Sequence, residues 1–196
     1  MSQSFFEIGK EASKNFLSNL KKDKHLLLLY EDAEKAINFQ IDFILQGLEK
    51  KECCIIAMPS NIDFEEKLAQ KIDIQRFKND ELLHILKVPS TIDYSKSFET
   101  FKKFASDILS ISSDKVRICG MLDFDLSKKE GMDAFISAET ISHKNFHSFN
   151  GSWLCSYDVK KMEEKEKMSW IKKLFNCHDS VIVIPEQNGG IAFDVE

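Results

Sequence analysis

The sequence lacks the short motifs that mark the common phosphate-transfer and hydrolytic sites. No segment matches G-x-x-x-x-G-K-[ST], the loop whose backbone N–H groups and lysine hold nucleotide phosphates. No G-x-S-x-G elbow occurs, and spacing ties none of the five histidines to a nucleophile. We therefore expect a protein that is not an enzyme and that carries no catalytic residues and no cofactor.

Long apolar runs and an excess of positive charge are also missing. No apolar run approaches the roughly 18–20 residues that span a bilayer. The opening residues, MSQSFFEIGKEASK, lack the apolar core and small-residue cleavage site of a secretory signal. The net charge is −5 with intermixed signs, which argues against binding to a phosphate backbone. We expect a cytoplasmic protein that contacts neither a membrane nor nucleic acid directly.

Paired cysteines are absent as well. The five cysteines are odd in number, show no C-x-x-C spacing and fall mostly within apolar, strand-like runs: Cys53, Cys54, Cys119, Cys155 and Cys177. A thiol in such a run behaves as a small hydrophobic group. The spacing predicts buried reduced thiols, with neither a disulfide framework nor a zinc site and no other metal.

Apolar runs alternate with helical patterns along most of the chain, and 196 residues suffice for one sizeable core. The predicted strands are 26–29, 53–58, 82–88, 116–122 and 153–157, and the predicted helices are 33–48, 62–72, 96–111, 130–147 and 162–176. Such alternation is typical of a mostly parallel sheet between two helical layers. We predict an α/β three-layer sandwich.

The two ends of the chain depart from this alternation. Apolar runs at 181–184 and 191–195 flank an Asn-Gly pair, which predicts a C-terminal antiparallel hairpin. Residues 4–20 have a loosely helical spacing and predict an amphipathic helix. We favour its packing on the core over a dimer contact or a connection to a partner. The expected division is an N-terminal segment, 1–23, and a single domain, 24–196.

The turn after the first parallel strand reads Tyr30-Glu31-Asp32 and would repel phosphate. Acids in a first helical turn stabilise the helix dipole by about 0.3–1 kcal/mol each, which is the simplest role for Asp32. Ligand sites in such sheets lie beyond the carboxyl ends of the strands. There we expect Tyr30-Glu31 to meet Tyr157-Asp158, together with Pro59-Ser60 and Asp123-Phe124.

Helix 130–147 carries a carboxylate within its apolar pattern. Glu139 and His143 fall on the face defined by the apolar side chains Met132, Phe135, Ile136 and Phe146. A buried carboxylate is unfavourable unless it is paired or hydrogen-bonded, so Glu139 would need a partner such as His143 or would line a polar spot in a pocket. A rotated helix with Ala134, Ala138 and Ile141 inward remains an equal alternative.

Two histidines stand beside strands. His25 precedes the first parallel strand and His178 precedes the hairpin. Each alone is more often a structural group than a ligand contact. Together with the other candidates they would supply the few oriented polar groups of an apolar pocket. The candidate ligand-binding residues are His25, Tyr30, Glu31, Glu139, Tyr157, Asp158 and His178.

Several of these residues stand in ordered motifs that resemble one family. The motifs are His25-x4-Tyr30-Glu31, Gly47-Leu48 followed by Glu52, the strand Val116-Arg117-Ile118-Cys119-Gly120, the helix with Glu139, Leu154-Cys155-x-Tyr157-Asp158 and the later His178. Over about residues 24–184 the chain resembles the MEDS domain, the methanogen/methylotroph DcmR sensory domain. The first strand, helix and strand are also similar to KaiC/RecA-like ATPases, with the phosphate loop replaced.

The resemblance implies a RecA/KaiC-like scaffold without the phosphate machinery, used as a sensory module for hydrocarbon derivatives. No kinase or DNA-binding domain is evident, so we expect a small organic ligand and a separate signalling protein, such as a histidine kinase or a transcription regulator, with a homodimer as a further arrangement. The alternatives are a relative of RecA/KaiC-like ATPases that still binds nucleotide through an altered loop, and a pure protein-interaction scaffold.

Overall fold

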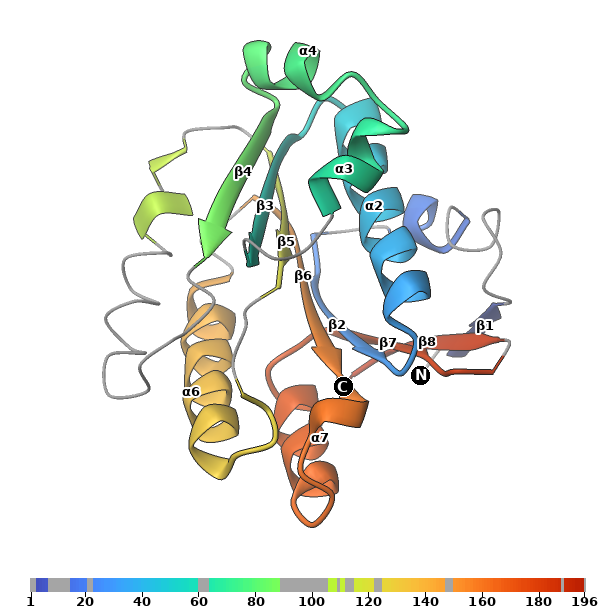
Figure 1. Ribbon diagram of the computed structural model, residues 1–196, viewed down its shortest axis with the longest axis vertical. Helices are drawn as coiled ribbons and strands as arrows, with labels where there is room; N and C mark the ends of the chain where they lie inside the picture. Colours follow the sequence, from blue (N-terminus) through green and yellow to red (C-terminus); the bar gives the residue numbers. More distant parts are fainter. Residues whose placement is uncertain are drawn as a thin grey trace.

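The computed structural model describes residues 3–6, 15–20, 23–59, 64–88, 106–108, 110–111, 115–121, 125–146, 150–187 and 189–195. Its centre is an eight-stranded sheet with the order β1-β8-β7-β2-β6-β5-β3-β4 (Figure 1). The strands are β1 (Gln3–Phe6), β2 (His25–Tyr30), β3 (Cys53–Pro59), β4 (Leu83–Val88), β5 (Val116–Gly120), β6 (Gly151–Asp158), β7 (Ser180–Ile184) and β8 (Gly190–Asp194). The helices are α2 (Ala33–Glu49), α3 (Phe64–Ala69), α4 (Ile74–Asn79), α6 (Lys129–Phe146), α7 (Lys167–Phe175) and the short 3₁₀ helix η2 (Val159–Lys161).

The sheet is parallel except at one edge. Strands β4, β3, β5, β6, β2 and β7 pair in parallel, whereas β8 is antiparallel to both β7 and β1. The turn between β7 and β8 contains Gly189 with φ 102°, a left-handed conformation that glycine adopts without strain. The predicted mostly parallel sheet with a C-terminal antiparallel hairpin is therefore confirmed.

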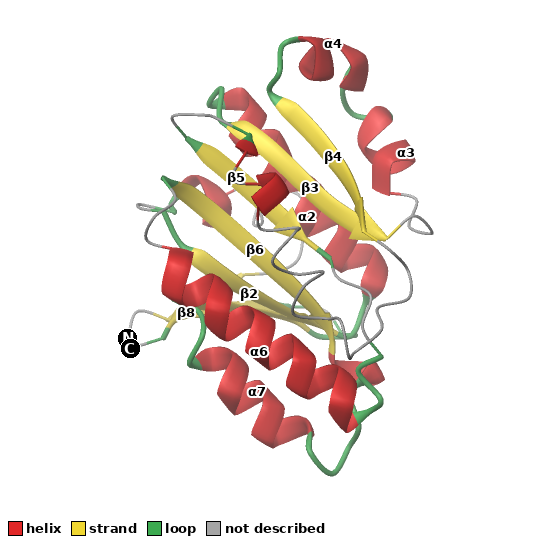
Figure 2. Cartoon of the chain, turned by 90° about the vertical axis from the view of Figure 1, so that its left-hand side faces the viewer, coloured by secondary structure: helices red, strands yellow, loops and turns green. Residues whose placement is uncertain are grey.

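Two hydrophobic cores lie on opposite faces of the sheet. In β2, Leu26 and Leu28 face the core under α2, while Leu27 and Leu29 face the core that α6 and α7 cover. Helices α6 and α7 run side by side over one face, with α2 on the other (Figure 2). This arrangement confirms the predicted three-layer sandwich.

Helix α2 begins at a capped position. The side chain of Asp32 accepts a hydrogen bond of 3.0 Å from the backbone N–H of Lys35. That bond lowers the pKa of Asp32, because it favours the charged carboxylate. The expected role of Asp32 at the helix N-terminus is confirmed.

A buried ion pair closes the far end of α2. Arg117 Nε on β5 lies 2.6 Å from Glu52 Oε2, and an Arg117 terminal N–H donates to the carbonyl of Phe43 over 2.9 Å. At Gly47 an added Cβ would stand 2.6 Å from Cys54 Sγ and 2.7 Å from Arg117 Cδ. Glycine is required there because the arginine side chain passes directly over the helix backbone.

The N-terminal helix prediction is wrong for residues 4–6. These residues belong to β1, whose register pairs Phe5 with Ile191 at the edge of the sheet. Adjacent Phe5 and Phe6 fit no single helical stripe, and pairing with β8 supplies backbone hydrogen bonds instead. Residues 15–18 are helical. The division of the chain at residue 23 stays a prediction.

Other boundaries also shifted. The predicted helix 62–72 is two helices, α3 and α4, and the second begins where the Asp73 side chain accepts from the N–H of Arg76. Helix α7 starts at Lys167, after η2, and β5 ends at Gly120. Of the predicted helix 96–111, the structure describes only residues 106–108 and 110–111. In the described ranges, no helix is long and apolar enough to cross a membrane.

Candidate functional site

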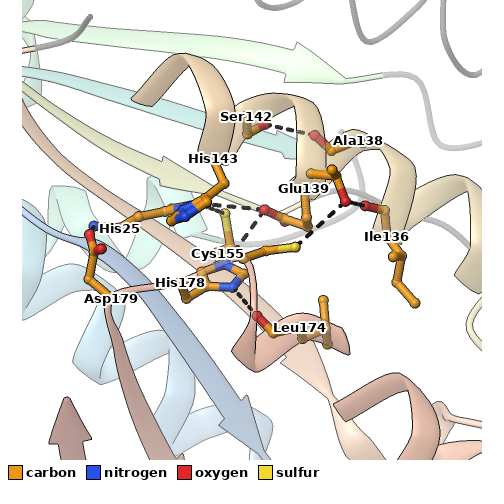
Figure 3. Close-up of polar contacts among 12 residues, drawn as sticks. His25, Ile136, Ala138, Glu139, Ser142, His143, Cys155, Leu174, His178 and Asp179 are labelled. Carbon is orange, nitrogen blue, oxygen red and sulfur yellow. Dashed lines mark hydrogen bonds and ion pairs between the residues drawn. The ribbon is translucent and has the colours of Figure 1, made fainter. Parts of the chain in front are cut away.

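A group of polar side chains is buried between the central strands and α6. His25 begins β2, Cys155 and Tyr157 lie in β6, His178 immediately precedes β7, and Glu139 comes from α6. Figure 3 shows His25, Glu139, Cys155 and His178 converging from these separate elements. We call these four residues the buried cluster.

Strand geometry brings the sheet members of the buried cluster together. Strand β2 lies between β6 and β7, with His25 opposite Trp153 and Leu27 opposite Cys155. Because alternate residues of a strand share a face, Cys155 and Tyr157 point to the same side as His25. This is the side that α6 covers, so Glu139 meets them from above.

Glu139 has one bound and one open carboxylate oxygen. Oε1 accepts a hydrogen bond from the Tyr157 hydroxyl. Oε2 lies 3.5 Å from both His25 Nε2 and His178 Nε2, and among the described residues it has no hydrogen-bond partner. Burial alone would raise the pKa of Glu139, but the two imidazoles and the Tyr157 hydroxyl outweigh it and lower the pKa to about 2. Glu139 is therefore an anion at neutral pH.

The two imidazoles are held close together. The rings of His25 and His178 have centroids 4.1 Å apart. His178 Nδ1 lies 2.7 Å from the carbonyl oxygen of Leu174, and burial lowers the pKa of His178 to about 4 despite the nearby Glu139. His178 is therefore neutral near pH 7. His25 Nδ1 lies 3.5 Å from His143 Nδ1, on the neighbouring turn of α6.

A backbone clamp fixes the positions of both histidines. The N–H of His25 donates to Asp179 Oδ2 over 2.8 Å, and the N–H of Asp179 donates to the carbonyl of His25 over 2.8 Å. Asp179 adjoins His178 in the sequence. The start of β2 and the start of β7 are thus tied to each other, which leaves the two rings little freedom to separate.

Cys155 and Tyr157 complete the polar group from β6. Cys155 Sγ lies 3.5 Å from His25 Nε2. Burial, and then the negative charge of Glu139, raise the pKa values of both side chains well above their ordinary values. In this environment both side chains keep their protons at neutral pH. All five cysteines of the chain are free and buried, as predicted.

The structure gathers four of the seven predicted site residues and leaves three apart. His25, Glu139, Tyr157 and His178 are neighbours on the α6 face of the sheet. His25 and His178 lie at the amino ends of β2 and β7, away from the carboxyl edge where Tyr30, Glu31 and Asp158 stand, whereas Tyr157 directly precedes Asp158 and points its side chain toward Glu139. The ligand-binding role of all seven residues stays a prediction.

The three residues at the carboxyl edge have local roles. Glu31 Oε2 accepts from the backbone N–H of Glu186 over 3.0 Å. Asp158 accepts from the N–H of Lys160 over 3.0 Å and so caps η2. Burial, with Asp158 nearby, raises the pKa of Tyr30 to about 12. Ser60, Asp123 and Phe124, which were expected at the same edge, lie outside the described residues.

Sequence reasoning left open whether Glu139 faces the core and missed one of its neighbours, Cys155. Met132, Phe135 and Glu139 are all buried; of the alternative face Ala138 is buried as well, but Ala134 and Ile141 are partly exposed. The expected partner His143 instead faces His25. Cys155 was treated only as a buried thiol, although its spacing of two from Tyr157 places both on one face of a strand. The spacing of the cysteines also argued against a metal site. Such spacing does not reveal side chains that come together from four distant positions, as in the buried cluster.

Comparison with known proteins identifies a family. The pattern of the MEDS family, the methanogen/methylotroph, DcmR sensory domain, matches residues 24–179. The chain belongs to the MEDS family. Its MEDS segment begins one residue before His25 and ends one residue after His178, so it includes the whole buried cluster. Membership indicates a sensory role.

A solved structure shares the fold of this MEDS domain. The crystal structure of the KaiC-like protein PH0186 from the hyperthermophilic archaeon Pyrococcus horikoshii OT3 matches with a TM-score of 0.57 and 12% sequence identity. The match covers 88% of this chain and 78% of the other chain. It confirms the predicted RecA/KaiC-like fold and, at this identity, nothing beyond the fold. The comparison with curated proteins found none that matches.

Proposed function

We propose that this chain is a non-enzymatic sensory domain that binds a small organic molecule at the buried cluster and signals to a separate protein. The observation that carries the proposal is Glu139, a buried carboxylate with one oxygen that has no hydrogen-bond partner in the part of the chain that the structure describes. Such groups are rare in folded proteins because desolvating a charge without pairing it is unfavourable. Ionisable groups with strongly shifted pKa values are concentrated at functional sites, where binding and catalysis use them.

The position of the cluster suits a signalling role. Glu139 lies on α6, which packs against α7, and His178 follows α7 directly. A ligand that drew these side chains together would favour one arrangement of the two helices over another. The helices form an outer layer of the domain, where a histidine kinase or a transcription regulator could detect the change.

The first turn supports a role without nucleotide chemistry. Glu31 is engaged by the backbone of Glu186 and Asp32 caps α2, so both acids remain where a phosphate loop would need N–H donors and a lysine. We expect isothermal titration with ATP and Mg²⁺ to give no heat at millimolar nucleotide. A measurable heat of binding would favour the nucleotide-binding alternative.

Native mass spectrometry of gently purified protein tests the sensory ligand. We expect a non-covalent organic mass that is lost on denaturation and absent from the Glu139→Gln variant. Glu52→Gln provides the matched control, since it changes a buried carboxylate on the other face of the sheet in the same way. Retention of the same mass by Glu139→Gln would show that the site lies elsewhere. No retained organic mass in the wild-type protein would count against the proposal.

A further inference from the structure

His178 Nε2 and Glu139 Oε2 face each other in the buried cluster. His178 Nδ1 lies 2.7 Å from the carbonyl oxygen of Leu174, which can only accept, so Nδ1 carries the hydrogen. The other ring nitrogen, Nε2, lies 3.5 Å from the carboxylate oxygen Glu139 Oε2. Within the described ranges neither atom has a hydrogen-bond partner. A metal ion placed between the two atoms would satisfy both of them.

Two further donor atoms surround the same point. His25 Nε2 lies 3.5 Å from Glu139 Oε2 and 3.5 Å from Cys155 Sγ. With His178 Nε2 they form a set of four buried donor atoms, all within 4.8 Å of one another. The four atoms come from β2, α6, β6 and the turn before β7, so they enclose the point from several directions (Figure 3).

The spacing fits a tetrahedral metal ion better than a hydrogen-bonded network. Hydrogen bonds between nitrogen and oxygen measure about 2.7–3.2 Å, shorter than the 3.5 Å from Glu139 Oε2 to either imidazole. Donor atoms bound to one tetrahedral Zn²⁺ at about 2.0–2.3 Å lie roughly 3.3–3.7 Å apart. All three 3.5 Å contacts fall in this range, and small side-chain rotations bring in the wider pairs.

Neighbouring groups hold the donors as the outer partners of a metal site do. Metal-binding histidines commonly donate their other ring N–H to a carbonyl or carboxylate, and metal-binding carboxylates are themselves hydrogen-bonded. Here the Leu174 carbonyl engages His178 Nδ1, and the Tyr157 hydroxyl engages Glu139 Oε1. The atoms left over, His178 Nε2 and Glu139 Oε2, are the ones that point inward.

We propose that His25 Nε2, Glu139 Oε2, Cys155 Sγ and His178 Nε2 together bind one divalent transition-metal ion, with Zn²⁺ the best match. Imidazole and thiolate donors favour Zn²⁺ and its neighbours over Mg²⁺ or Ca²⁺, which prefer oxygen. The carboxylate and the thiolate, which loses its proton on binding, neutralise the two positive charges within the low-dielectric interior. The inference rests on the proposed function in one respect: the ion would hold in place the side chains that surround the organic molecule in the sensory site.

Cobalt titration of chelator-treated protein tests the metal site directly. Tetrahedral Co²⁺ bound to a thiolate gives a near-ultraviolet charge-transfer band and strong visible bands. We expect both to saturate at one Co²⁺ per chain and to disappear when Zn²⁺ is added. Cys155→Ser should abolish the charge-transfer band, whereas Cys177→Ser should keep it, because Cys177 Sγ contacts Thr140 and is not among the four donors.

A second variant keeps the test decisive if Cys155→Ser does not fold. Tyr157→Phe removes only the support of Glu139 Oε1 and should weaken Co²⁺ binding by about 10–100-fold while the bands persist. Absence of the bands in the wild-type protein, or loss of them in Cys177→Ser, would overturn the site. So would unchanged Co²⁺ affinity in Tyr157→Phe.

The outcomes separate the metal site from the sensory proposal. If the wild-type protein binds no Co²⁺ but retains an organic mass in native mass spectrometry, the metal site is wrong and the sensory role stands. If it binds Co²⁺ with the expected bands but retains no organic mass, the metal site stands and the organic ligand is wrong. In the first case the contacts of Cys155 with His25 and of Tyr157 with Glu139 account for the cluster without a metal ion.

Discussion

Two buried glutamates stand on opposite faces of the sheet and differ in how they are paired. Glu52 is 3% exposed and Glu139 is 4% exposed, so burial does not distinguish them. Glu52 lies 2.6 Å from Arg117 Nε and 3.3 Å from Lys115 Nζ. Glu139 faces imidazoles, a thiol and a hydroxyl, and one of its oxygens has no hydrogen bond to any described residue.

The difference indicates what each glutamate does. Arginine is permanently charged and offers several donors in a fixed plane, so the ion pair with Arg117 satisfies Glu52 without any further ligand. Imidazole and thiol groups change protonation and bind metals. The proposed metal ion would therefore supply the positive charge that the surroundings of Glu139 lack. Both glutamates fall within residues 24–179, the segment that matches the MEDS family.

The largest loss of stability should come from breaking the ion pair between Glu52 and Arg117. Arg117→Met leaves Glu52 buried without its closest cation, and we expect the free energy of unfolding to fall by about 3–5 kcal/mol in urea denaturation. The double variant Glu52→Gln/Arg117→Met should lose less, because no unpaired charge remains. A loss below about 1 kcal/mol in Arg117→Met would show that Glu52 depends on Lys115 instead.

The next largest effect on stability should come from binding of the proposed metal ion to the buried cluster. A ligand that binds only the folded state at a hundred times its Kd stabilises that state by about 2.7 kcal/mol. We expect Zn²⁺ to raise the unfolding free energy of the wild-type protein and of Glu52→Gln by this amount. Glu139→Gln should show little change on adding Zn²⁺. If Zn²⁺ stabilised Glu52→Gln and Glu139→Gln equally, Glu139 would not be a metal ligand.

A smaller effect should appear in alkali at Tyr30, which is only partly buried. Its pKa is raised from 10.0 to about 12, so the folded state favours the neutral phenol. Its contribution to stability is complete below pH 10 and is lost as the pH rises to about 12. After allowance for partial exposure this amounts to about 1–2 kcal/mol. Unfolding of Tyr30→Phe by urea should therefore depend less on pH in this range, and an equal dependence would contradict the assignment.

The smallest effects should come from the two acids of the first turn, Glu31 and Asp32. Asp32→Ala removes the cap of α2 and should lower the unfolding free energy by about 1 kcal/mol. Glu31→Gln keeps an oxygen that accepts from Glu186 N–H and should change it by less than about 0.5 kcal/mol. A larger loss for Glu31→Gln in urea unfolding would show that the charge of Glu31 matters to the fold.

The fold followed from local patterns because each parallel strand is a short apolar run. The runs around Leu26 and Ile55 are buried on both faces, so their hydrophobicity is continuous and easily recognised. The edge strand β1 escaped prediction because its stability comes from pairing with β8, almost the whole chain away. Asp73 is a typical N-cap residue, so the start of α4 could have been predicted from the local sequence.

The site was only partly predictable, since its geometry depends on contacts between distant residues. The break in the apolar pattern at Glu139 was visible in the sequence, and the period of two in β6 linked Cys155 to Tyr157. That His25 and His178 stand 4.1 Å apart follows from β2 and β7 being neighbours, which no local pattern reveals. Pairing of the strands therefore decided which candidates meet.

The wide spacing of the buried cluster along the chain has a consequence for protein synthesis. His25 leaves the ribosome early, whereas His178 follows only after almost the whole domain has been made. No piece of the chain shorter than residues 25–178 contains all four donors. A ligand that needs the complete set can therefore be captured only after β7 has docked beside β2. Occupancy of the site would then report that β2, β6, β7 and α6 have assembled.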